Sequence, residues 1–369
     1  MIRKNMTPVA LACGMALLLN QVVALSQGSR NQTDTIDTVT RTQVIQEVLV
    51  KLDENYIFPQ VAKDLEKAIQ AKQQKGEYDS ITSGDALAAV LTAQLRELSH
   101  DQHLKVSYAP PPPVSVPDDP VTRKQSRDSF IREAEMENFG FSEAKMLDGG
   151  IGYLDVRDFY QPSLATETLS AAMSFLANSN ALIIDLRNNG GGHTDTPPLF
   201  LSYFFDKPVQ LTSIVWREGN RIEEHWTNAN VPGKRFGENK PVYVLTSKAT
   251  FSAAEGIAYD LQSFKRAVIV GEITRGGANP GDFFRLSGNF RMFIPTGRTV
   301  NPRTNSNWEM VGVKPDVQCS ERLAMKTAHL LALQKVIATS ADPGLRSDLE
   351  KPLAKAQKEL ADLKKSLSI

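Results

Sequence analysis

Cysteine is scarce in this 369-residue sequence, and neither sign of charge is in excess. The only cysteines are Cys13 and Cys319, so no intramolecular disulfide can form if the segment around Cys13 is removed. The 42 Lys and Arg residues balance the 42 Asp and Glu residues, which gives no electrostatic reason to expect nucleic acid or an anionic membrane as a partner. Stability must therefore come from an apolar core, and the length suits one large or two modest domains.

The N-terminus has the pattern of an export signal. Arg3 and Lys4 precede the apolar stretch VALACGMALLLNQVVAL, and small residues follow around Ala24 and Ser26. We expect a signal peptide over residues 1–26 and a periplasmic or extracellular protein with no stable membrane insertion after cleavage. A retained anchor is the alternative, because the stretch approaches the roughly 18 residues that span a bilayer. No later segment is long and apolar enough to do so.

Periodicity divides the rest of the chain. Residues 33–108 have helical spacing with few breakers, which predicts an N-terminal helical domain in which Ser83 caps the third helix. The stretch APPPPVSVPDDP opens a predicted Pro-rich linker over 109–128. Residues 129–320 alternate strand and helix patterns, which predicts an α/β core with a mostly parallel sheet and two hairpins. Residues 321–369 return to helical spacing.

Two predicted strand-to-helix junctions carry candidate chemistry, because sites in α/β sheets form where strands end. Gly190, Gly191 and Gly192 follow the buried strand ALIIDLR and could turn backbone N–H groups toward a ligand oxygen. Ser252 opens a helix after the strand PVYVLTS, with small residues beside it. A flexible turn and an ordinary helix cap are the plainer interpretations of these two junctions.

Five ordered motifs favour the chemical interpretation: GGIGYLDVRDF, LIIDLRNNGGG, TSKATFSAAE, IVGEITRGGA and WEMVGVKPDV. Together they resemble the carboxy-terminal processing (tail-specific) serine proteases, closest to the branch of the interphotoreceptor retinoid-binding protein and the tricorn core, over about residues 150–318. The resemblance implies a crotonase/ClpP-like ββα core and a nucleophile at Ser252. It also implies an oxyanion hole formed by the amides of Ala253 and Gly191.

The resemblance leaves the general base to be chosen. The processing branch uses a lysine at the position of Gly277, and this chain lacks it. Arg275 stays protonated, and Lys248 is a poor candidate only four residues before the serine. The other branch uses histidine, which suits proton transfer near neutral pH and points to His103 in LSHDQHLKV. His193 and His100 are the rivals, whereas we interpret His225 and His329 as ordinary.

A histidine base needs an acceptor that fixes its tautomer. The resemblance points to Glu309 in NWEMVGVKPDV for this role. It also implies that Gly190, Gly192, His193 and Gly277 line the site. Glu255, three residues after Ser252, is expected to support the site or to complement the helix dipole. The tricorn arrangement has a serine directly before the histidine, where this chain has Gln102, so a triad is expected rather than a tetrad.

The expected function is that of an exported serine endopeptidase that hydrolyses peptide bonds through an acyl-enzyme. No cofactor and no metal ion is expected. About 40 residues separate His103 from GGIGY, too few for the PDZ domain that the processing branch inserts there. A catalytically inactive module that binds an apolar ligand, as in the retinoid-binding relative, is the main alternative. A crotonase-type acyl-CoA enzyme is disfavoured by the export signal.

Overall fold

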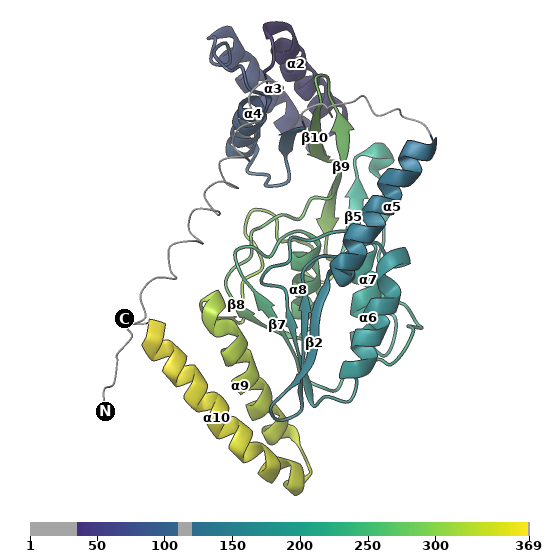
Figure 1. The fold of residues 1–369 in the computed structure, drawn as a ribbon, viewed down its shortest axis with the longest axis vertical. Coiled ribbons are helices and arrows are strands. Elements are labelled where there is room, and N and C mark those ends of the chain that lie inside the picture. The colour runs from purple at the N-terminus through teal and green to yellow at the C-terminus, as the bar shows by residue number, and fades with distance from the viewer. Residues whose placement is uncertain (1–34, 110–119, 368–369) are drawn as a thin grey trace, which may run out of the picture.

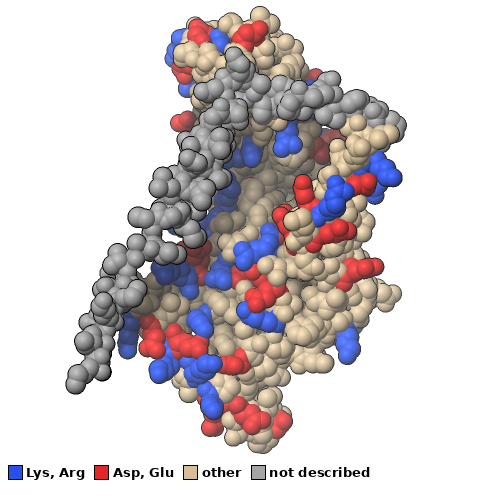
Figure 2. All heavy atoms as spheres, in the orientation of Figure 1, with Lys and Arg blue, Asp and Glu red and all other residues tan. Residues whose placement is uncertain are grey.

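The computed structural model describes residues 35–109 and 120–367 (Figure 1). The predicted signal peptide over 1–26 and the Pro-rich stretch 110–119 lie outside the described residues. Within the described residues, no helix combines the length and the apolar character needed to cross a membrane. Figure 2 shows Lys and Arg side chains interspersed with Asp and Glu on the face drawn, so the balanced composition does not conceal a large surface of one charge there.

The N-terminal part is helical, as predicted. It contains α2 (Thr38–Asn55), α3 (Pro59–Gln74) and α4 (Gly84–Ser99), followed by the short strand β1 (Lys105–Tyr108). Proline at the start of α3 suits the first helical position, which has no use for an N–H donor. Ser83 caps α4 by accepting a hydrogen bond from the Ala86 N–H at 3.4 Å, which confirms the predicted cap.

A hairpin from the distant core sequence completes this N-terminal part. The strands β9 (Gly281–Arg285) and β10 (Phe290–Pro295) form a small antiparallel sheet with β1 in the order β1-β10-β9. Side chains of the hairpin join the apolar cluster of the three helices, among them Phe290, Met292 and Ile294. The unit is therefore more than the predicted helical bundle, and we call the three helices, β1 and this hairpin the N-terminal module.

The core is built on a six-stranded sheet with the order β12-β8-β7-β4-β3-β2. Its strands are β2 (Phe141–Leu147), β3 (Ile151–Val156), β4 (Ala181–Asp185), β7 (Val242–Thr246), β8 (Val268–Gly271) and β12 (Val317–Gln318). All neighbours are parallel except β2, which runs antiparallel to β3. Every residue of β3, β4 and β7 is buried, as expected of strands covered on both faces, and the predicted mostly parallel sheet is confirmed.

Helices cover both faces of the sheet. One face carries α6 (Pro162–Leu176), α7 (Thr196–Leu201) and α8 (Ala253–Ser263), whose apolar residues share one cluster with the strands. The other face carries α9 (Glu321–Thr339), which packs against the strands and against α10 (Pro343–Leu367). In Figure 1 these two C-terminal helices lie below the sheet, on the side away from the N-terminal module.

Three smaller features complete the fold. The helix α5 (Pro120–Met136) begins inside the range predicted as linker, because Pro120 fits the start of a helix as well as it fits an extended segment. A three-stranded sheet has the order β11-β5-β6, with β5 (Ser213–Trp216), β6 (Ile222–Glu223) and β11 (Gly297–Val300), and it contains the other predicted hairpin. Short 3₁₀ turns span Asn138–Gly140, Ser202–Phe204 and Glu218–Asn220.

Candidate active site

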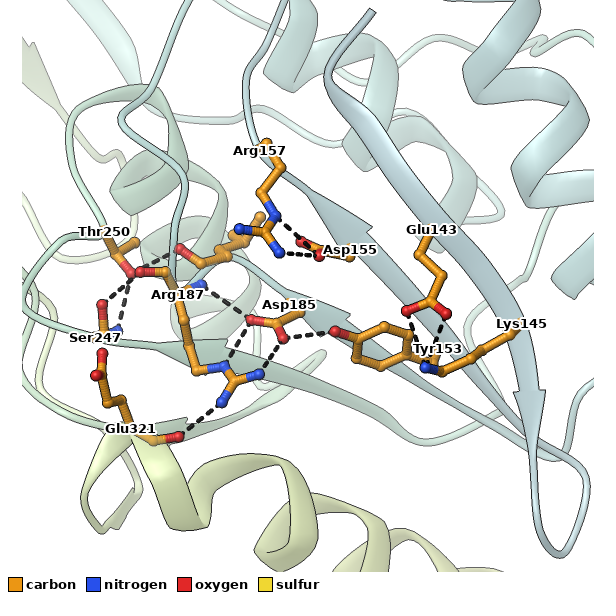
Figure 3. Close-up of polar contacts among 11 residues, drawn as sticks. Glu143, Lys145, Tyr153, Asp155, Arg157, Asp185, Arg187, Ser247, Thr250 and Glu321 are labelled. Carbon is orange, nitrogen blue, oxygen red and sulfur yellow. Dashed lines mark hydrogen bonds and ion pairs between the residues drawn. The ribbon is translucent and has the colours of Figure 1, made fainter. Parts of the chain in front are cut away.

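The two junctions singled out in the sequence lie beside each other at the carboxyl ends of β4 and β7. The Thr250 hydroxyl donates to the carbonyl of Leu186 at 2.8 Å, and the Ser247 hydroxyl donates to the carbonyl of Arg187 at 2.5 Å (Figure 3). Arg187 in turn forms an ion pair with Asp185 at the end of β4. These bonds tie the loop before Ser252 to the loop that leads into the three glycines.

Ser252 stands at the first turn of α8 with backbone angles φ 55° and ψ −121°, a conformation rare for any residue with a side chain. The Glu255 carboxylate holds the turn, because it accepts hydrogen bonds from the N–H groups of Ser252 at 2.8 Å, Gly276 at 2.7 Å and Gly277 at 2.9 Å. The Thr274 hydroxyl is a fourth donor, at 2.5 Å. Burial raises the pKa of Glu255, and these four donors oppose the rise.

His103 reaches Ser252 from the N-terminal module. Its Nε2 atom lies 3.1 Å from Ser252 Oγ, although 149 residues separate them in the sequence. The ring packs on Phe251, with centroids 4.4 Å apart, and on Phe293 of the hairpin, at 5.9 Å. Burial, and then the nearby charges of Arg275 and Arg96, lower the pKa of His103 to about 3. The imidazole is therefore neutral near pH 7 and free to accept a proton.

The space around Gly277 is filled by other side chains, so residue 277 could not carry a lysine side chain while His103 occupies its present position. A Cβ atom on residue 277 would lie 2.7 Å from His103 Cε1 and 2.2 Å from Phe251 Cε2. Both contacts are shorter than van der Waals packing permits. Since the two rings fill the space where a side chain of residue 277 would begin, the missing lysine and the buried imidazole belong to the same arrangement.

The glycine loop packs directly against the serine. A Cβ atom on Gly191 would lie 2.8 Å from Ser252 Cβ, and the φ of 109° at Gly191 itself favours glycine. Of the two amides expected in an oxyanion hole, that of Ala253 has no acceptor among the described residues. The Gly191 N–H donates to Asn189 Oδ1 at 2.8 Å, so this amide already has a partner in the structure.

The other candidate histidines lie apart from Ser252 Oγ. His193 accepts a hydrogen bond from the Asp195 N–H at 3.3 Å, and its side chain is 44% exposed. His100 ends α4 in a left-handed conformation. His329 makes a hydrogen bond with the Asp148 carbonyl at 2.9 Å, outside the site. Among the histidines, all of which lie in the described residues, only His103 is within hydrogen-bonding distance of the serine.

The acidic partner of His103 is less simple than the sequence indicates. Glu309 accepts a hydrogen bond from the Ala278 N–H at 2.5 Å through Oε2, whereas its Oε1 is buried and has no partner among the described residues. His103 Nδ1 is also buried without a hydrogen-bond partner there. Sequence reasoning missed Asp101, whose Oδ1 lies 3.9 Å from His103 Nδ1. The signal available for Asp101 was its place two residues before the histidine.

A largely apolar cleft opens beside the serine. Its lining includes Ser252, Ala253, Gly277 and Ala278, together with Pro198, Leu211, Ile214, Pro280 and Trp308. His225 and Asp260 also line it, which the sequence did not indicate. Asp260 accepts hydrogen bonds from Thr212 and Asn301, and burial raises its pKa to about 7. Such a cleft can receive an uncharged side chain next to the hydroxyl.

One group in the described part of the chain has donors suited to a metal ion. Asp195, Glu223 and His225 offer ligand atoms that all lie within 4.8 Å of one another. Glu223 is already bonded to Trp216, Arg221 and His225, and Asp195 is exposed. The cluster is thus satisfied by the protein's own contacts, and no cofactor is assigned to it.

A partly buried serine–histidine pair at a strand-to-helix turn is the layout found in α/β serine hydrolases. The profile of peptidase family S41 matches residues 150–319, and that of the N-terminal domain of peptidase S41 in eukaryotic IRBP matches residues 38–138. The chain belongs to peptidase family S41. The resemblance inferred from the motifs is thereby confirmed.

Individual relatives agree with this assignment. The chain is 30% identical over 168 residues to carboxyl-terminal-processing peptidase 2 of Arabidopsis thaliana chloroplasts, which covers 45% of this chain and 31% of the relative. A putative peptidase from Parabacteroides merdae has a similar fold, with a TM-score of 0.56, 18% identity, and 82% and 99% of the two chains covered. The tricorn protease gives a TM-score of 0.51 at 13% identity, covering 86% of this chain and 37% of that one. The chain thus spans about a third of the length of its curated plant relative.

Proposed function

We propose that this protein is an exported serine endopeptidase in which Ser252 is the nucleophile and His103 the general base. The single observation that carries the proposal is the 3.1 Å separation of Ser252 Oγ from His103 Nε2, at a turn with a positive φ. A strained turn that presents a hydroxyl to a neutral imidazole serves nucleophilic catalysis, and an ordinary helix cap does not require it.

The proposed reaction is acyl transfer. Ser252 Oγ forms a bond to the carbonyl carbon of the scissile peptide while its proton passes to His103 Nε2. The carbon–nitrogen bond then breaks, and the imidazolium returns the proton to the leaving amine. Water attacks the acyl-enzyme by the same route in reverse, which frees the acid product and the serine hydroxyl.

The developing oxyanion needs donors close to Ser252. The Ala253 N–H is available, and we propose it as one of them. The Gly191 N–H stays a candidate for the other, on condition that its bond to Asn189 Oδ1 is exchanged for one to the oxyanion. Gly190 and Gly192, which flank it, and His193, which follows, belong to the proposed substrate-facing surface. Glu309 stays a predicted acidic member.

A fluorophosphonate probe tests this proposal, because it reacts only with an activated serine. Wild-type protein should be labelled, and neither Ser252→Ala nor His103→Ala should be labelled at a comparable rate. The same preparations should cleave casein in the same order. A folded wild type that resists the probe, and that instead binds an apolar dye in the cleft, would favour the alternative of an inactive apolar-ligand module.

The proposed location outside the cytoplasm has its own test. Residues 1–26 have the pattern of a signal peptide, and we propose that the mature chain begins near Gln27. N-terminal sequencing of the protein recovered from a secreting host would give this start. Recovery of the intact N-terminus in the membrane fraction would support the retained anchor instead.

A further inference from the structure

Asp101 is a buried carboxyl group that belongs to neither the predicted nor the proposed catalytic set. It is 2% exposed and lies on the loop between α4 and β1, two residues before His103. It accepts three hydrogen bonds: from the Tyr56 hydroxyl at 3.1 Å, the Asn279 side-chain amide at 3.1 Å, and the His103 backbone N–H at 2.9 Å. Burying a carboxyl group is costly, so such a complete set of donors calls for an explanation.

These three donors come from both halves of the molecule. Tyr56 follows α2 in the N-terminal module, whereas Asn279 lies on the core loop that runs from Gly276 to β9. That loop also contains Gly277, against which the His103 ring packs. The Asp101 carboxyl group thus joins the loop that carries the proposed base to the loop that forms the opposite wall of the site.

The tautomer of His103 determines which ring nitrogen needs a hydrogen-bond acceptor. If Nε2 is to take the serine proton, the resting proton of the neutral ring must be on Nδ1. That Nδ1–H is buried and has no hydrogen-bond partner among the described residues. A buried donor without an acceptor is unfavourable, and Asp101 Oδ1 lies 3.9 Å away. A movement of about 1 Å would bring the two atoms within hydrogen-bonding distance.

Glu309 is the competing acceptor, and its surroundings differ. Burial, and then the charge of Asp101, raise the pKa of Glu309 to about 8, so near pH 7 it holds a proton. The pKa of Asp101 is also raised by burial, but its three donors oppose the rise. When two nearby carboxyl groups share one charge, the group with more donors carries it. The charged groups and the other titratable groups around this pair are Tyr56, Arg96, His103, Glu255 and Arg275.

We propose that Asp101 is the positioning residue of the site: it fixes His103 between the N-terminal module and the core, and it accepts a hydrogen bond from Nδ1–H when the imidazole becomes protonated. This inference rests on the proposed acyl transfer from Ser252. Glu309 then acts as a neutral neighbour of the pair and does not hold the imidazolium itself.

The test compares Asp101→Asn with Glu309→Gln, two substitutions that each replace one carboxyl group with an amide of the same shape. The readout is the second-order rate constant of fluorophosphonate labelling between about pH 3 and 9, a range that includes the lowered pKa of His103 and the raised pKa of Glu309. Asp101→Asn should lower the rate by about 10²–10⁴-fold, the range seen when the acid that orients a catalytic histidine is lost. Glu309→Gln should lower it by only about tenfold, within the range of a weakened neighbouring contact.

The pH profile separates positioning from general damage. Loss of a negative charge beside the imidazole lowers the pKa of His103, so the acid limb of Asp101→Asn should move to lower pH. A merely structural effect would scale the rate equally at every pH. Glu309→Gln should lose any inflection of the wild-type profile near pH 8, where Glu309 releases its proton.

Controls keep the outcomes distinct. Glu143→Gln removes an exposed carboxylate on β2 that pairs with Lys145, and its rate should match the wild type. If Asp101→Asn does not fold, Tyr56→Phe removes a single donor to Asp101 and should lower the rate several-fold. A larger loss in Glu309→Gln than in Asp101→Asn, or an unshifted acid limb, would overturn this inference. Failure of the wild type itself to react would instead overturn the proposed function.

Discussion

The serine and the histidine of the site are held by different kinds of structure. Ser252 sits on a turn whose backbone is held by hydrogen bonds from the core, chiefly those of Glu255 three residues later. His103 sits on a loop of the N-terminal module and meets the core through Asp101, Asn279 and the ring of Phe251. The proposed nucleophile is therefore held in place by local contacts, whereas the position of the proposed base depends on how two parts of the chain fit together.

The largest loss of labelling should come from removing the carboxylate that holds the Ser252 turn. Glu255→Ala leaves the N–H groups of Ser252, Gly276 and Gly277 and the Thr274 hydroxyl without their common acceptor. We expect labelling to fall at least about 10³-fold, since the strained turn loses its support. We also expect about 3 kcal/mol less stability in urea unfolding, because buried donors are left unsatisfied.

Glu255→Gln is the matched variant for that prediction. It keeps an acceptor oxygen for part of the donor set and should retain both more stability and more labelling than Glu255→Ala. Equal rates for Glu255→Ala and wild type would show that the turn of Ser252 holds its conformation without this carboxylate.

Two neighbouring glycines sharpen the comparison within the core. Gly191→Ala adds a Cβ atom 2.8 Å from Ser252 Cβ at a φ of 109°, so we expect labelling to fall by about 10²-fold through displacement of the serine. Gly190→Ala adds the same atom where no other atom lies within 4 Å, so it should lower the labelling rate much less than Gly191→Ala does. Equal rates for the two variants would contradict the packing of the glycine loop on the serine.

The dependence of His103 on the N-terminal module is best tested by a substitution in the β9–β10 hairpin. Met292→Ala removes a fully buried side chain of β10 from the N-terminal module and should cost about 2–5 kcal/mol of unfolding free energy. We expect labelling of the still-folded protein to drop by less than the Glu255→Ala loss, because the core retains its own contacts. Arg285→Ala changes an exposed side chain on β9 and serves as the control. It should keep the wild-type free energy of unfolding.

The smallest effect is a shift in pH dependence. Because the pKa of His103 is lowered below the ordinary 6.5, its neutral form persists at pH values where a free histidine is mostly charged. Labelling of the wild type should therefore fall only well below pH 6.5. The same sign applies to stability: protons bind the unfolded chain first as the pH drops below 6.5, so the native state loses stability from there downward. A labelling midpoint at or above pH 6.5 would contradict the buried, neutral imidazole.

Several parts of this structure were accessible from the sequence for identifiable reasons. The buried strands β3, β4 and β7 appear as short apolar runs, and the helices follow from their spacing and from caps such as Ser83. The short strand β1 and the edge strands β2 and β12 lack such runs, so they were not predicted. Proline at 120 looked like linker, although it begins α5.

The site shows the same division. Ser252 could be selected from the ordered motifs and His103 from the segment LSHDQHLKV, and the structure brings them together at 3.1 Å. Asp101 and Asn189 were not predicted, because their contacts form only on folding. Asp101 contacts Tyr56 and Asn279, and Asn189 accepts a hydrogen bond from the Gly191 N–H. The place of Asp101 two residues before His103 was visible in the sequence, but its contacts with Tyr56 and Asn279 were not, because those residues lie far along the chain.

The β9–β10 hairpin has a consequence for the order of events during biosynthesis. Because the apolar interior around α2, α3 and α4 includes Met292 and Ile294, that unit cannot be completed until the ribosome has passed residue 294. The loop bearing the imidazole thus stays unanchored while the nascent chain emerges. The proposed acyl transfer, which needs His103 beside Ser252, therefore requires a chain that has been made at least as far as this hairpin.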